Sequence, residues 1–98
     1  MLIAVSGTVE VLQFSENGIL QARIGIGHDT VPVIEIAPGT WHSIAVQSAT
    51  AVLMEIKPGP FRPAEFAAWS PAEDSQEAGR MASWLGRAAL QETWPPAI

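Results

Sequence analysis

The chain has 98 residues, a length that supports one domain with a single hydrophobic core. Apolar residues make up 48% of the chain and charged residues 15%, a composition that excludes a disordered polypeptide. Ten acidic residues against five basic ones exclude the basic face of a nucleic-acid-binding protein, and the absence of cysteine excludes disulfides and thiol chemistry.

The strands of the predicted fold lie before Lys57, where short apolar runs alternate with turn residues. We expect strands at 2–5, 8–14, 19–26, 31–36, 41–46 and 51–57. The Asn17-Gly18 dipeptide is typical of a hairpin between the second and third strands. Pro32 is typical of an edge strand or of the first residues of a strand.

The side chains of these strands alternate between two faces. In the second strand, one face carries Val9 and Val11 and the other carries Leu12 and Phe14. The third strand is expected to place four apolar residues on one face: Leu20, Ala22, Ile24 and Ile26. No helical pattern separates the strands, so the sequence predicts a mainly β fold, a small antiparallel sandwich or barrel.

A single helix is predicted in the last third of the chain. Pro58-Gly59-Pro60 ends the last strand, because proline has no N–H for a sheet. Residues 70–73 form a capping box with proline at the first helical position, and residues 74–77 offer a second start. Apolar residues at helical spacing then predict a C-terminal helix near 75–90. We therefore divide the chain into a β domain (1–70) and a C-terminal helix and tail (71–98) that pack on it.

His42 is the first candidate functional residue. It follows the Pro38-Gly39 turn by three residues, at the start of a predicted strand. A strand end holds an imidazole rigidly enough for metal binding or proton transfer. The spacing alone favours the alternative, an ordinary histidine near the end of a strand.

Several motifs together resemble one family. Pro38-Gly39-Thr40-Trp41-His42, with 55–61 and 68–73, resembles the WbuC family of cupin-fold metalloproteins, and 5–18 resembles its central hairpin. The resemblance implies a cupin-like β-barrel that binds a divalent metal ion (Zn, Ni, Mn or Fe), with His42 as the metal ligand of the second cupin motif. Gly7 resembles the glycine that closes the first motif, but the six residues before it include no His or Glu. The first metal-binding motif is therefore lacking, or the start site is misplaced.

Other residues are candidates for the same site. His28, beside Asp29, is either a further metal ligand or part of a solvated turn. Glu55 and Lys57 share a strand face and are expected to pair, in a ligand-binding site or as a surface salt bridge; Glu55 is also a candidate metal ligand. Trp41 either lines a ligand pocket or packs in the core. Arg62 either meets an anionic ligand at the mouth of the barrel or is a surface charge.

Two functions are open on these grounds. The first is a small metal-binding cupin, with a site that is reduced or completed by a second chain, which binds a sugar or another small polar ligand. The second is a non-catalytic β-barrel remnant that serves as an oligomerisation or ligand-binding module. The cupin resemblance implies that strands before the first motif are also missing. Their loss would leave apolar surface and a sheet edge exposed, so we expect a homodimer.

No catalytic residue and no enzymatic activity are assigned from the sequence. No apolar run approaches the roughly 20 residues of a membrane span, and the first residues lack the basic head of a signal peptide. We therefore expect a cytoplasmic protein with neither a membrane nor a nucleic acid as a partner.

Overall fold

The computed structural model describes residues 1–60 and 62–96, and it consists of two antiparallel sheets followed by one helix. The first sheet has the strand order β4-β1-β6 and the second has the order β3-β2-β5. The elements, in chain order, are β1 (Leu2–Ser6), β2 (Thr8–Phe14), β3 (Leu20–Gly27), β4 (Val33–Ile34), β5 (Trp41–Val46), β6 (Val52–Glu55) and α1 (Gln76–Leu85). The predicted mainly β fold with a C-terminal helix is confirmed.

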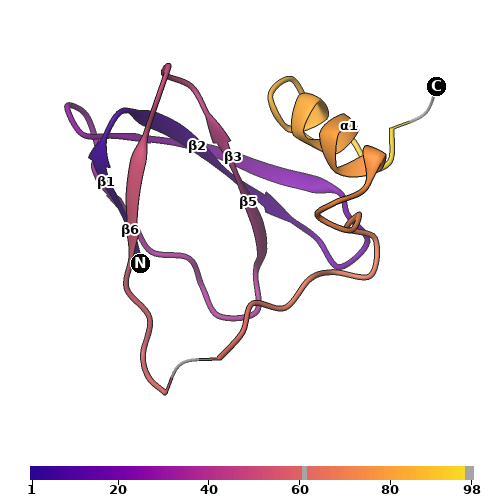
Figure 1. Cartoon of the computed structure of the whole chain (residues 1–98), viewed down its shortest axis with the longest axis horizontal. Helices are drawn as coiled ribbons and strands as arrows, with labels where there is room; N and C mark the ends of the chain where they lie inside the picture. The colour runs from indigo at the N-terminus through magenta and orange to yellow at the C-terminus, as the bar shows by residue number, and fades with distance from the viewer. Residues whose placement is uncertain (61, 97–98) are drawn as a thin grey trace.

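The elements form three layers (Figure 1). The β4-β1-β6 sheet lies at the left of the view, the β3-β2-β5 sheet crosses the centre, and α1 lies at the upper right. Strand pairing among the described residues stays within each sheet, so the two sheets form a sandwich and not a closed barrel.

Strand β2 is buried on both sides because its side chains alternate between two cores. Val9 and Val11 point toward the other sheet, whereas Leu12 and Phe14 point toward α1. The buried residues of the sandwich core are Leu2, Ala4, Val9, Val11 and Ile26. Those of the helix core are Leu12, Phe14, Leu20, Ala45, Met81, Trp84, Leu85, Ala88 and Trp94. The expectation of a single core was wrong, because the second sheet is covered on both faces.

The predicted face of the third strand is also wrong at one position. Gln13 pairs with Ala22 and Phe14 pairs with Leu20, so Gln21 has no partner on β2 and the register shifts there. A bulge of this kind moves the residues beyond it to the opposite face. Leu20 therefore packs in the helix core, whereas Ile26 packs in the sandwich core.

Two edge strands are shorter than predicted. β4 contains only Val33 and Ile34, because Pro32 has no N–H and offers only its carbonyl oxygen, which accepts from the amide of Ala4 at 2.7 Å. β6 ends at Glu55, before the Pro58 to Pro60 segment. By contrast, the observed bounds of β2 and β5 are those predicted.

Helix α1 begins at the second of the two predicted starts. Ser75 is the N-cap, and its hydroxyl accepts a hydrogen bond from the amide of Ala78 at 3.3 Å. The capping box at 70–73 lies before the helix, in residues without helical structure. The helix also stops earlier than predicted, at Leu85 before Gly86.

The segment after α1 returns to the second sheet at the edge formed by β3. Thr93 forms an isolated bridge with Ile19, and the amide of Leu20 donates to the carbonyl of Glu92 at 2.8 Å. Ala88 and Trp94 are buried against the sheet. Within 1–60 and 62–96, no helix combines the length and apolar character needed to cross a membrane.

Candidate functional site

A cleft of about 740 Å³ opens at one end of the sandwich. Its walls are the start of β1, the loop between β4 and β5, the first residues of β5, and the chain that follows β6. These segments run along the lower part of the molecule in Figure 1. Ligand-binding pockets are typically about 300–1,000 Å³, so this cleft is large enough for a small molecule. Its polar side chains are Thr40, His42, Glu55, Lys57, Arg62 and Glu65.

His42 lies at the start of β5 and lines the cleft. It pairs with Gln13 on β2 and so lies on the side of the sheet that faces β1 and β6, but it is exposed. Its Nδ1 lies 3.0 Å from the carbonyl oxygen of Thr40. A carbonyl oxygen only accepts, so Nδ1–H is the donor in this contact, and Nε2 has no hydrogen-bond partner among residues 1–60 and 62–96. The Pro-Gly turn therefore holds the imidazole at an open mouth of the sandwich and not in a closed cavity.

Glu55 and Lys57 stand on the opposite wall of the cleft. The Nζ atom of Lys57 lies 3.3 Å from Oε1 of Glu55, so the predicted pairing is confirmed. Both side chains are largely exposed, at 44% for Glu55 and 58% for Lys57, and an ion pair with this exposure contributes little to stability. Both groups are therefore available to a ligand at little energetic cost.

Arg62 and Glu65 complete the charged lining of the cleft. Both come from the chain between β6 and α1, and both are exposed. Arg62 takes part in no salt bridge with the other described residues. Glu65 was missed at the level of sequence, since it stands alone in a loop without a recognisable motif. The lining thus holds both signs of charge on apolar walls that include Leu2, Ile36 and Ile56.

Two predicted site residues lie away from the cleft. His28 follows Gly27, which pairs with Thr8, whereas His42 pairs with Gln13. Five residues of strand separate these pairings, about 17 Å along β2, so the two imidazoles occupy opposite ends of the sheet. Trp41 points to the other face of β5 from His42 and packs against the helix core. There it borders a smaller pocket of about 150 Å³ beside Phe14 and Trp69.

The donor set does not fit the divalent metal ion that the cupin resemblance implies. A metal site of catalytic type uses about three protein ligands. Among the described residues, no group of three or more His, Asp or Glu side chains is arranged to hold a metal ion. A metal site at His42 would therefore need donors from outside the described part of this chain.

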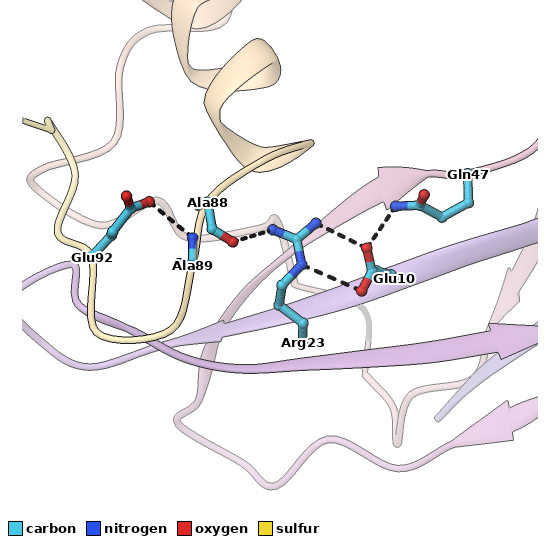
Figure 2. A network of polar contacts seen from close by, with 6 residues as sticks. All are labelled: Glu10, Arg23, Gln47, Ala88, Ala89 and Glu92. Carbon is cyan, nitrogen blue, oxygen red and sulfur yellow. Dashed lines mark hydrogen bonds and ion pairs between the residues drawn. The ribbon is translucent and has the colours of Figure 1, made fainter.

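A second polar cluster joins the second sheet to the segment after α1 (Figure 2). The Arg23 guanidinium donates to both carboxylate oxygens of Glu10, at 2.9 Å and 3.3 Å, and to the carbonyl oxygen of Ala88 at 2.7 Å. The Gln47 amide donates to Glu10 at 2.7 Å. Arg23 and Glu10 do not line either of the two pockets described above. The contact with Ala88 ties the segment after α1 to the second sheet.

No family model matches the sequence, and neither a curated protein nor a solved structure is significantly similar to it. The resemblance to WbuC-type cupins stays a prediction that rests on the short motifs alone.

Proposed function

We propose that this protein is a non-catalytic domain that binds a small polar ligand in the cleft at the end of its sandwich. The observation that carries the proposal is the cleft itself, about 740 Å³ in volume and lined by His42, Glu55, Lys57 and Arg62. Surface grooves of this size with several convergent polar groups are the usual location of ligand sites.

The lining favours a ligand with hydroxyl groups and one acidic group. The carboxylates of Glu55 and Glu65 accept hydrogen bonds from hydroxyls, and free Nε2 of His42 accepts one more. The Arg62 guanidinium offers paired N–H donors to a carboxylate or phosphate. An acidic monosaccharide matches both requirements, because it carries hydroxyls on a compact ring and a single carboxylate.

The test is titration of isotopically labelled protein with glucuronic acid, followed by amide NMR shifts. The expected result is a saturable shift of the amides of Gly39, Thr40, His42 and Lys57, with those of α1 unchanged. Glucose is the comparison ligand and is expected to bind more weakly, since it lacks the carboxylate that Arg62 would hold.

A matched pair of variants makes the test specific. Arg62→Gln is expected to weaken glucuronic acid binding about tenfold, the usual effect of losing one charge-assisted hydrogen bond. Arg87→Gln removes an exposed arginine that does not line the cleft, and it should leave binding unchanged. Equal losses in both variants, or saturable shifts located elsewhere, would contradict the proposal.

Oligomerisation is a second candidate role, and a different observation favours it. The outer face of the β4-β1-β6 sheet is apolar, with Val52, Met54 and Ile56 of one edge half exposed at 54%, 51% and 50%. Ile56 borders both this face and the cleft, whereas Val52 and Met54 do not line the cleft, so the two roles use largely different residues.

A further inference from the structure

The outer face of the β4-β1-β6 sheet is an uncharged apolar surface. Leu2 and Ala4 of β1 and Leu53 of β6 point into the sandwich core. The residues that alternate with them along the two strands therefore point outward. We define the outer apolar face by its members, Ile3, Val5, Val33, Val52, Met54 and Ile56.

A continuous row of apolar side chains crosses the outer apolar face. Val33 pairs with Ile3, and Ile3 pairs with Met54, so one residue from each strand lies in line. Glu55, the charged residue of β6, points to the opposite side with Leu53. Glu35 follows β4 and borders the face by alternation, in the position of a polar rim. The centre of this surface therefore has no charge that would need a complementary partner.

We propose that the outer apolar face is the interface with a second copy of this chain. Its exposed fractions, which lie between 40% and 54% for five of its six residues, correspond to roughly 400 Å² of surface. A stable interface buries about 800 Å² from each partner, of which about 60% is apolar, or roughly 500 Å². The face therefore supplies most of the apolar area that one half of a stable dimer requires, and the rest would come from residues at its border.

The shape and composition of the face suit a symmetric pair. In a two-fold interface the same patch meets itself, so a net charge on the patch would repel its own copy. The outer apolar face meets this condition even though the chain carries a formal charge of −5. β-branched and methionine side chains on a sheet also pack face to face, as in the aligned sheets of a sandwich.

The test is the molar mass in solution of the full chain and three lysine variants, by sedimentation equilibrium at tens of micromolar. The wild type is expected at twice the chain mass of 10.4 kDa. Met54→Lys and Val52→Lys should weaken the dimer about a hundredfold or more and sediment at the single-chain mass, because each buries an unpaired ammonium group.

Val46→Lys is the matched control. Val46 and Val52 are both valines on edge strands with nearly equal exposure, 57% and 54%, but Val46 lies on β5 in the other sheet. Val46→Lys is therefore expected to remain dimeric. Far-UV circular dichroism identical to the wild type would show that each variant is folded.

Three outcomes would overturn the proposal. They are a wild type that sediments at the single-chain mass, a Val46→Lys variant that dissociates as completely as Val52→Lys, and folded Met54→Lys and Val52→Lys variants that both remain dimeric. Each of these results is independent of ligand binding in the cleft, so dimerisation and ligand binding succeed or fail separately.

Discussion

The guanidinium of Arg23 on β3 donates a hydrogen bond of 2.7 Å to the carbonyl oxygen of Ala88, which lies 65 residues further along the chain. Arg23 reaches this carbonyl while it also holds the carboxylate of Glu10 (Figure 2). The contact therefore fastens the segment after α1 to the sheet that the helix covers.

Replacing Arg23 is expected to destabilise the fold substantially. The Arg23 and Glu10 side chains are only 16% and 28% exposed, so Arg23→Met leaves the Ala88 carbonyl without its side-chain donor and the Glu10 carboxylate with only the Gln47 amide. The expected loss is about 2–3 kcal/mol in the free energy of unfolding. Urea unfolding followed by tryptophan fluorescence measures it, since Trp84 and Trp94 lie in the helix core.

Arg80→Met is the matched control for this prediction. Arg80 also pairs with a glutamate, Glu77, but the two side chains are 62% and 50% exposed. Losing this pair is expected to cost less than about 0.5 kcal/mol. Comparable destabilisation in the two variants would show that the Ala88 contact does not fasten the helix segment.

Gly7 and Gly39 differ in the space beside them, although both adopt a positive φ, +75° and +79° respectively. A Cβ at Gly7 would collide with the backbone oxygen of Thr50 and with the hydroxyl of Ser48, whereas a Cβ at Gly39 would meet no atom within 4 Å. Gly39→Ala should therefore cost about 1 kcal/mol, for the left-handed conformation alone. Gly7→Ala should cost about 3 kcal/mol or more, because the clash adds to it.

Thermal unfolding by circular dichroism compares these two glycine variants. A smaller loss for Gly7→Ala than for Gly39→Ala would contradict the close approach of the turn between β1 and β2 to residues 48–51.

Ser75 and Ser70 provide a similar comparison at the start of the helix. The Ser75 hydroxyl accepts from the Ala78 amide at 3.3 Å and donates to the Ala72 carbonyl at 2.6 Å. Ser75→Ala is expected to cost about 1 kcal/mol, the usual effect of losing an N-cap. Ser70→Ala should be nearly neutral, and the reverse order in urea unfolding would place the helix start at 70–73.

The metal content of the purified protein separates the cleft proposal from the metal-site hypothesis. Protein prepared without added metal or an affinity tag is expected to contain far less than one equivalent of Zn, Ni, Mn or Fe by mass spectrometry. The reason is the donor set, since the described residues of one chain do not supply three ligands. One equivalent of metal that is lost in His42→Ala would instead support a site completed by a second chain.

Local patterns in the sequence predicted the central elements well. β2 and β5 have the predicted bounds, because turn residues flank both strands: Gly7 and Ser15 for β2, and Gly39 and Ser48 for β5. The bulge at Gln21 was not predicted. It depends on how β3 pairs with β2, and the order of apolar and polar residues in β3 alone does not indicate it. The sequence offered two candidate helix starts, and the structure uses the second, with Ser75 as the N-cap.

The sequence predicted only the part of the site formed by residues close together in the chain. Glu55 and Lys57 pair as expected, because residues two apart share a face. The predicted hairpin places His28 near the start of β2, but the position of His42 depends on how β5 pairs with β2, and spacing in the sequence does not contain that information. The same holds for Glu65, which reaches the cleft through a loop of no regular structure.

The alternation of β2 side chains between two cores has a consequence for how this small protein unfolds. Consecutive residues, such as Val11 and Leu12, are both fully buried but in different cores. The strand cannot be withdrawn from one core while the other survives, so heat or denaturant should melt both in a single cooperative step. We therefore expect the β domain (1–70) and the C-terminal helix and tail (71–98) to unfold together and not as independently stable halves.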